Sequence, residues 1–277
     1  MTGARIKTHP PNWPPSLVGT VMVALIGLSS GLSPAKAAGC PREGTLGVSR
    51  VLAVDAKSFP RVGLKSFPQT LPLADHEVVL TFDDGPSQKT TPRVLTALAH
   101  ECVRATFFMV GKSAARFPEL VRRVAVEGHT VAHHTWSHPM VSQITFDRAK
   151  EDIDRGIAAV EMALNGTSST TPSTPFFRFP YFDSTPATLD LLQSRGIIVF
   201  GADLWASDWE KMKPNQELRL VTKRLKAAGK GIILFHDTRA RTAAMMPAFL
   251  QYLRKNGYRV VHVVPAPQSQ RNPDAAR

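Results

Sequence analysis

Residues 78–86 read VVLTFDDGP, and this stretch decides the fold that the sequence predicts. Its first five residues are apolar, aromatic or β-branched and indicate a buried strand, which Gly85 and Pro86 end with a turn. The strand delivers two adjacent carboxylates, Asp83 and Asp84, to its carboxyl end. Active sites of α/β proteins lie at that end, although Asp, Gly and Pro are also common in plain surface turns. The stretch therefore indicates either an acidic site on an α/β sheet or an ordinary turn.

The rest of the chain alternates between strand and helix patterns, which favours parallel strands joined by helical crossovers. Strands are predicted at 78–83, 105–111, 130–133, 176–180, 197–203, 231–237 and 258–263. Helices are predicted at 91–102, 113–128, after 145, from 184 to 196, at 215–228 and at 239–255. The charged residues at 150–155 predict a solvated flank on the third of these helices.

Composition sets the broad class of the protein. The chain has 277 residues, 43% of them apolar, and a net charge of +12, which indicates one large globular domain suited to an anionic environment. The basic residues are scattered and no phosphate-binding glycine loop occurs, so we expect no nucleic-acid partner and no nucleotide. Residues 38–76 are predicted to be an extended segment lying on the domain, 77–264 the domain itself and 265–277 a polar tail.

Residues 1–37 have the features of a secretory signal peptide. Arg5 and Lys7 precede an apolar stretch at 17–32, and the sequence Ala-Lys-Ala at 35–37 offers a cleavage site. We therefore expect export, to the periplasm or the medium, with no transmembrane span after cleavage. The alternative is an uncleaved membrane anchor.

The chain contains two cysteines, Cys40 and Cys102. In an oxidising compartment they could form a disulfide. Alternatively, Cys40 could be a lipid-acceptor cysteine, and Cys102 could be a buried apolar residue.

A group of histidines follows the strand predicted at 130–133. His134 and His138 are four residues apart and could meet at one metal ion if the backbone turns between them, which Pro139 favours. A carboxylate from Asp84 would complete a site of two histidines and one carboxylate with an open position. That composition is typical of a catalytic zinc rather than a structural one.

Three later strand ends also carry polar or aromatic side chains. Arg178 lies in an apolar run and would need an anionic partner if buried, for which Asp83 is the obvious candidate. Trp209 and a second tryptophan lie beside Asp208 and could line a sugar-binding cleft or belong to the core. His236 ends an apolar strand, where it could act as a general acid or be a hydrogen-bonded core histidine.

Five motifs, TFDDGP, HTWSHP, RFPY, SDW and LFHD, begin at residues 81, 134, 178, 207 and 234. In order and approximate spacing they resemble the motifs of the polysaccharide deacetylases, also called the NodB-homology domain or carbohydrate esterase family four. The resemblance covers about 78–263, nearly all of the domain. It implies an α/β fold, a distorted (β/α) barrel with about seven parallel strands. It also implies metal-dependent removal of acetyl groups from N-acetylglucosamine units of a glycan.

The resemblance implies roles for individual residues as well. It makes Asp83 the catalytic base, oriented by Arg178, and His236 the acid, tuned by Asp208. The backbone N–H of Tyr181 would face the oxyanion. The acetyl pocket would be shaped by Trp209 and Leu234.

The same resemblance implies a divalent metal bound by Asp84, His134 and His138. Zinc is the first choice, and cobalt or nickel could occupy the same ligands. His133, which precedes the first metal histidine where similar proteins often have asparagine, would either support the site through a hydrogen bond or compete for the metal.

Two other functions stay open beside a deacetylase. One is a carbohydrate-binding protein that keeps the pocket without turnover, and the other is an amidase acting on a small non-sugar amide. Chitooligosaccharide, peptidoglycan and exopolysaccharide all present the same N-acetyl group, so all three are candidate substrates.

Overall fold

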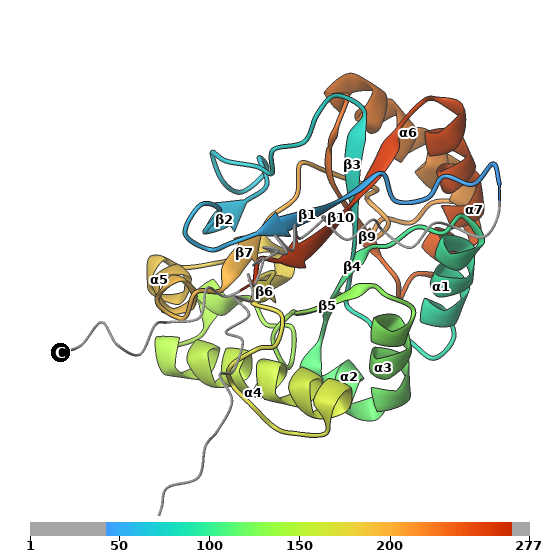
Figure 1. Ribbon diagram of the computed structural model, residues 1–277. Helices are drawn as coiled ribbons and strands as arrows, with labels where there is room; N and C mark the ends of the chain where they lie inside the picture. The colour runs from blue at the N-terminus through green and yellow to red at the C-terminus, as the bar shows by residue number, and fades with distance from the viewer. Residues whose placement is uncertain (1–42, 268–277) are drawn as a thin grey trace, which may run out of the picture. The chain divides into compact units, whose positions relative to one another are not determined.

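Ten strands make one sheet in residues 43–267, the part of the chain that the computed structural model describes (Figure 1). The strands are β1 (Arg50–Val54), β2 (Arg61–Val62), β3 (Glu77–Asp83), β4 (Thr106–Met109), β5 (Thr130–His133), β6 (Phe176–Phe177), β7 (Ile198–Phe200), β8 (Leu204–Trp205), β9 (Gly231–His236) and β10 (Arg259–Pro265). Every strand pair is parallel. The predicted α/β class is therefore confirmed.

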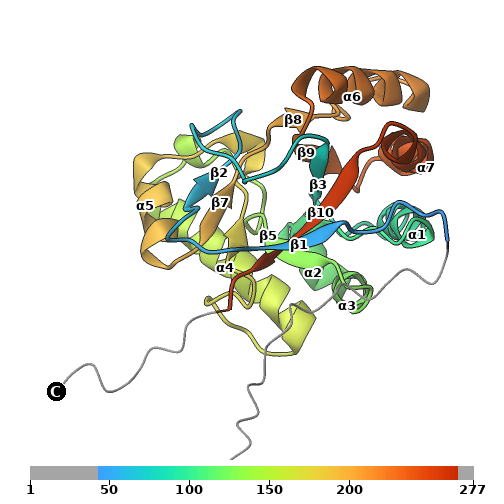
Figure 2. The same ribbon diagram turned by 45° about the horizontal axis from the view of Figure 1, so that its top comes forward.

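Helices connect these strands and cover the outside of the sheet (Figures 1 and 2). They are α1 (Thr91–His100), α2 (Gly111–Arg116), α3 (Pro118–Val126), α4 (Phe146–Asn165), α5 (Pro186–Ser194), α6 (Pro214–Ala228) and α7 (Ala240–Lys255), with 3-10 turns η1 (Val141–Gln143) and η2 (Pro180–Phe182). The single helix predicted at 113–128 is wrong. Pro118 disfavours helical geometry at Phe117 (φ −132°, ψ 58°), so the chain breaks there into α2 and α3.

All seven predicted strands are present, as β3, β4, β5, β6, β7, β9 and β10. The other three, β1, β2 and β8, were not predicted. β1 and β2 lie in the segment 38–76, where apolar residues show no sustained alternation, and β2 and β8 have only two residues each. Strands this short leave too little pattern to detect.

The sheet curves into an incomplete barrel. Its strands follow the order β8-β9-β3-β4-β5-β6-β7-β2, and in residues 43–267 its two edge strands, β8 and β2, each pair with one neighbour. Asp203 bridges the gap between these edges. Its carboxylate accepts hydrogen bonds from Leu64 N after β2, from Thr70 Oγ1 and from Ile232 N of β9, each 2.8 Å long.

Strands β1 and β10 close the amino end of the barrel. β10 pairs with the first two residues of β3, and β1 pairs with β10. Further along β10, the carbonyl of Val263 accepts a 2.7 Å hydrogen bond from Thr130 Oγ1 at the start of β5. The carboxyl ends of the strands are left for the functional site.

Alternate residues of the strands pack inside the barrel or under the helices. One apolar cluster, which includes Val79, Phe108 and Ile232, contains no helical residue and fills the interior. Neighbouring positions such as Leu80 and Phe82 belong to a second cluster with residues of α1, α3, α6 and α7. A third cluster lies under α4 and α5. This period-two alternation is the expected consequence of strand geometry.

The predicted signal peptide at 1–37, Cys40 and most of the polar tail lie outside the described residues. Cys102 is disulfide-bonded, so the idea that it is simply a buried thiol is wrong. No helix within residues 43–267 is long and apolar enough to cross a membrane.

Candidate active site

The strand alternation determines which side chains enter the barrel at its carboxyl end. Asp83 follows Val79 on the inner face of β3, and His236 follows Ile232 on the inner face of β9. Asp83 and His236 are direct partners in the β3–β9 register. Both side chains therefore reach the same end of the barrel.

Asp84 departs from this alternation because its backbone is left-handed, with φ of 74°. The backbone turns at this residue, so two consecutive carboxylates can face one cleft. Thr135 and His138 are also left-handed, with φ of 61° and 62°, in the turn after β5. Each such residue costs about 1–3 kcal/mol and persists where its surroundings fix it, most often at functional sites.

The three predicted metal ligands converge. Ligand atoms of Asp84, His134 and His138 all lie within 4.8 Å of one another. Asp84 Oδ1 is 3.1 Å from His138 Nε2 and 3.5 Å from His134 Nε2. The same Oδ1 is buried and has no hydrogen-bond partner. A buried, unpartnered carboxylate oxygen beside two imidazole nitrogens is the donor set that a divalent cation requires, so the residues fit a metal.

The backbone carbonyl of Arg178 fixes the tautomer of His134. Its Nδ1 lies 2.6 Å from the carbonyl oxygen of Arg178, which can only accept, so Nδ1 carries the proton. Nε2 then presents its lone pair to the cleft, as a metal ligand must.

Histidines also control the charge of Asp84. Burial by itself would raise the pKa of this carboxyl, but the nearby imidazoles of His134 and His138 and the charge of His236 hold its pKa well below the usual range. Asp84 is therefore ionised, which is the form that binds a cation.

Arg178 and Asp83 form the predicted buried pair. The guanidinium is fully buried, and its Nη1 donates to Asp83 Oδ1 and to Thr81 Oγ1, both at 2.8 Å. It also donates to the carbonyls of Phe200 and Gly201 at 3.3 and 2.7 Å. The second oxygen of Asp83, Oδ2, faces the metal ligands, 3.9 Å from His134 Nε2.

Asp208 holds His236 in place. Its Oδ1 accepts from His236 Nδ1 and its Oδ2 from the His236 backbone N–H, both at 2.7 Å. Burial would lower the pKa of His236, but the bond to Asp208 and the charges of Asp208, Asp84 and Asp83 raise it to about 9. His236 Nε2 lies 3.9 Å from Asp84 Oδ2, so it faces the three candidate metal ligands.

These groups line one cleft of about 560 Å³. Its remaining walls are mostly aromatic or apolar, and the lining side chains besides those above are Phe179, Tyr181, Phe182, Trp205, Trp209, Leu234 and Arg239. Tyr181 is 64% exposed and Trp209 44% exposed, so both aromatic faces are accessible to a ligand. The basic side chain of Arg239 was not predicted, because its position at the start of α7 shows no motif.

The backbone of Tyr181 is also left-handed, with φ of 58° and ψ of 9°. The next two residues donate backbone hydrogen bonds within the turn. Phe182 N donates to Phe179 O, and Asp183 N donates to Pro180 O. The N–H of Tyr181 donates to no group in residues 43–267, and it is free for a ligand.

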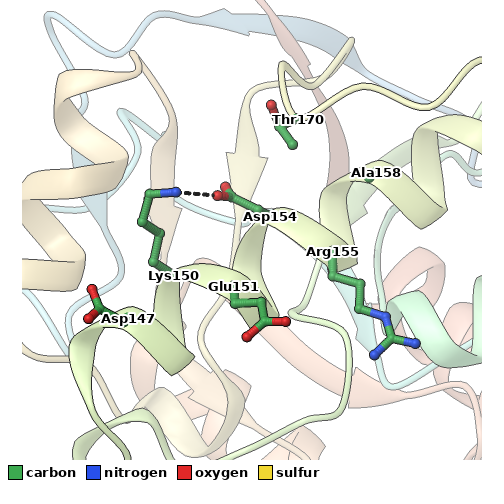
Figure 3. A pocket seen from close by; sticks show the side chains of 7 residues that line it. All are labelled: Asp147, Lys150, Glu151, Asp154, Arg155, Ala158 and Thr170. Atoms are coloured by element: carbon green, nitrogen blue, oxygen red, sulfur yellow. Dashed lines mark hydrogen bonds and ion pairs between the residues drawn. The ribbon is translucent and has the colours of Figure 1, made fainter.

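A larger hollow, of about 680 Å³, lies along α4 (Figure 3). It is lined by one surface of α4 and by Thr170 of the following loop, and two of its lining residues, Lys150 and Asp154, form a 2.8 Å ion pair four residues apart. None of the motif residues lines it. Exposed pairs of this kind are screened by water and stabilise little, so the smaller cleft is the candidate site.

His133 takes no part in the site. As the neighbour of His134 it points the opposite way, toward Glu161 of α4, with 3.6 Å between Nε2 and Oε1. Burial lowers the pKa of His133 to about 4, so this histidine is neutral. His133 was expected either to support the metal ligands through a hydrogen bond or to compete for the metal. Its side chain points away from those ligands, so neither expectation is met.

Asp152, a partly exposed residue of the predicted solvated flank of α4, also supports the turn that carries His138. Its carboxylate accepts from Trp136 N at 2.9 Å and from Ser137 N and Oγ at 3.0 and 2.7 Å. These bonds hold the turn between His134 and His138. The sequence pattern of α4 identifies the charged side of the helix, but it cannot show that a loop from β5 lies against it.

Two histidines and one carboxylate, flanked by an acid and a histidine, thus lie together at the open end of an α/β barrel, and their donor set fits a divalent metal ion. Comparison with known proteins gives the family. The profile described as polysaccharide deacetylase matches residues 71–200.

The peptidoglycan-N-acetylglucosamine deacetylase PgdA of Listeria monocytogenes is 31% identical over 188 residues, 67% of this chain but only 38% of that protein. A peptidoglycan-N-acetylglucosamine deacetylase of Bacillus cereus is 31% identical over 194 residues, 67% of this chain and 85% of its own length. The structure of the Bdellovibrio bacteriovorus peptidoglycan deacetylase Bd3279 matches with a TM-score of 0.71 and 31% identity, covering 82% of this chain and 62% of that one. The chain belongs to the polysaccharide deacetylase family.

Proposed function

We propose that this protein hydrolyses the N-acetyl groups of N-acetylglucosamine units in a polysaccharide or oligosaccharide, releasing acetate. The observation that carries the proposal is the convergence of a metal-binding triad, Asp83 and His236 in one aromatic-walled cleft. Two relatives named above are peptidoglycan-N-acetylglucosamine deacetylases, so peptidoglycan is the first substrate to test, beside chitooligosaccharide and an exopolysaccharide.

Asp84, His134 and His138 would hold the divalent cation, zinc being the first choice and cobalt or nickel the alternatives. When bound, such an ion polarises an amide carbonyl and lowers the pKa of water from about 16 toward 7. The orphaned Oδ1 of Asp84 and the fixed tautomer of His134 support this assignment.

Asp83 would act as the general base. Arg178 engages its Oδ1 and leaves Oδ2 directed to the cleft, where it can accept the proton of the attacking water. The free N–H of Tyr181 would donate to the oxyanion that forms, and such a contact contributes about 3 kcal/mol to the transition state.

His236 would act as the general acid. Because its pKa is raised to about 9, it is protonated at neutral pH, and Nδ1 is already engaged by Asp208. Nε2–H is then the proton donor for the leaving nitrogen, which cannot depart as an anion. Trp209 and Leu234 would bound the part of the cleft that receives the acetyl group, and Trp209 together with Tyr181 could stack on sugar rings.

The experiment is an acetate-release assay on N-acetylglucosamine oligomers, peptidoglycan and an exopolysaccharide. We expect release that chelation abolishes and zinc restores, and a loss of at least about 100-fold in Asp83→Asn and His236→Ala. Asp190→Ala is the control, because this acid is exposed and its one ion pair within residues 43–267 is with Arg61 across 3.3 Å. Glycan binding without acetate release would instead support a carbohydrate-binding protein, and release from small amides alone would support an amidase.

We also propose that the protein is exported after removal of residues 1–37. The basis is the sequence of the amino-terminal segment, which lies outside the described residues. Mass spectrometry of the protein from the cell envelope should give a mature chain beginning near Ala38. The same intact-mass measurement before and after reduction tests whether Cys40 is lipidated or takes part in a disulfide. Elemental analysis of that material tests the choice of zinc.

A further inference from the structure

A chain of hydrogen bonds continues behind His236 into the protein. Asp208 Oδ2, which already accepts from the His236 backbone, also accepts from Thr242 Oγ1 of α7 at 2.7 Å. The same Thr242 Oγ1 lies 3.0 Å from Glu217 Oε1 of α6. Asp208, Thr242 and Glu217 are all 0% exposed, so water cannot complete or replace these bonds.

The hydrogen bonds between Glu217, Thr242 and Asp208 must share a limited number of protons. Thr242 has one hydroxyl proton and lies between two carboxyl groups. If that proton is donated to Asp208, the oxygen of Thr242 can only accept from Glu217, which must then be protonated. Burial, and after it the negative charge of Asp208, raise the pKa of Glu217 to about 7, which favours that form.

Glu217 has no alternative partner that would explain its burial. Its other oxygen, Oε2, is buried without any hydrogen bond in the described part of the chain. A carboxylate with one hydrogen bond and no water would be costly, whereas a carboxylic acid that donates to Thr242 is not. The other charged groups acting on Glu217 are Arg241 and His236.

We infer that Glu217, acting through the Thr242 hydroxyl, is a positioning residue that fixes the orientation of Asp208 and thereby the hydrogen bond that Asp208 accepts from His236 Nδ1–H. When Glu217 donates to Thr242, the Thr242 hydroxyl donates to Asp208. Asp208 then holds the imidazole of His236 with its Nε2 toward the cleft. Without that donor, the Thr242 hydroxyl is free to turn away from Asp208. The inference rests on the proposed role of His236 as general acid.

The test compares variants that keep or remove the donor at each position. Glu217→Gln keeps an N–H that can donate to Thr242, and Glu217→Leu has similar size but no donor. Thr242→Ser keeps the hydroxyl, and Thr242→Val removes it with almost no change of shape. Each variant is assayed with zinc for kcat and KM, and the metal-free form is examined by proton NMR for the His236 Nδ1–H resonance.

We expect Glu217→Leu and Thr242→Val to lower kcat about tenfold with KM unchanged, and to shift or broaden the Nδ1–H resonance. Glu217→Gln and Thr242→Ser should stay within about threefold of the parental kcat. If Glu217→Leu and Thr242→Val both fold and keep the parental kcat and resonance, the inference is wrong. Full activity of His236→Ala would refute the proposed acid instead, while the NMR comparison would still decide the positioning role of Glu217.

Discussion

Arg178 joins three parts of the site through one buried side chain. Its guanidinium bonds to Asp83 of β3 and to the carbonyl of Gly201 after β7, and its own carbonyl orients His134. The guanidinium carbon lies 4.2 Å from the ring centre of Phe108, which covers its flat face. Lysine could not replace these contacts, because an ammonium has neither the planar fork nor the stacking surface.

We expect Arg178→Met to lower the free energy of unfolding by about 3–5 kcal/mol, because it leaves the carboxylate of Asp83 buried without a partner. Arg178→Lys should retain part of the stability but not the acetate release, which should fall at least about 100-fold in both variants. Urea unfolding and the acetate assay measure the two effects. If Arg178→Lys kept parental activity, the orientation of Asp83 by the guanidinium would not be needed.

Asp237, the residue after His236, is a buried acid that the proposed chemistry does not use. Its Oδ2 accepts from Thr91 Oγ1, and burial raises its pKa to about 7. A raised pKa means that the folded state binds this proton more tightly than the unfolded chain. The stability it contributes is therefore full below pH 4 and is lost as the pH rises to about 7.

Asp237→Asn keeps the shape and removes the titration. We expect the difference in unfolding free energy between the parent and this variant to change by about 4 kcal/mol between pH 4 and pH 8, in favour of the variant at the higher pH. Urea titrations of the metal-free protein at several pH values measure it. A difference that is constant over this range would show that Asp237 ionises normally.

At the level of elements, α4 acts as the support for the turn that carries His138. Asp152 bonds the turn, and Arg155 stacks on Trp136 with 3.9 Å between the guanidinium carbon and the ring centre. Gly156 lets the helix come close, because a Cβ there would lie 2.3 Å from the carbonyl carbon of Thr135. Together these contacts explain how left-handed residues are held in the turn.

We therefore expect Asp152→Ala to weaken zinc binding about tenfold or more while leaving the fold intact, because the turn loses three hydrogen bonds. Isothermal titration with zinc and circular dichroism measure these two properties. Glu151→Ala is the matched control, since Glu151 is exposed on the same helix and should not change the affinity. Equal zinc affinities in the two variants would show that α4 does not position His138.

The sequence predicts the residues of the site better than it predicts the helical residues that position them. The proposed metal ligands, Asp83, Arg178 and His236 all lie at strand ends on one side of the sheet, so strand order and period are sufficient to bring them together. The supports, such as Asp152 and Glu217, lie on helices and act across long separations in the chain. A helical pattern shows which side of α4 or α6 is polar, but not which loop packs on it.

For the whole molecule, the edges of the barrel are linked by the side chain of Asp203 and by a 2.9 Å backbone hydrogen bond from Lys65 N to Ala202 O, without a strand pair between them. β2 and β8 do not pair with each other, and Asp203 links the segment after β2 to β9. Gly63 permits the close approach, because a Cβ there would lie 2.5 Å from Ala202 N. No sequence pattern indicates such a contact between 63 and 203, so the predicted seven-strand barrel could not include it.

Asp203→Ala should consequently loosen the segment between β2 and β3 more than it affects the site. The carboxylate accepts three hydrogen bonds of 2.8 Å, and two of its donors are backbone N–H groups that would lose their partner. We expect the free energy of unfolding to fall by about 3 kcal/mol and limited proteolysis to cut first within 63–73, while zinc affinity is retained. Asp190→Ala, which breaks only the exposed contact with Arg61, should cost less than about 0.5 kcal/mol. If Asp203→Ala resists proteolysis as well as Asp190→Ala does, the backbone contacts beside β2 are sufficient to close the barrel without the carboxylate.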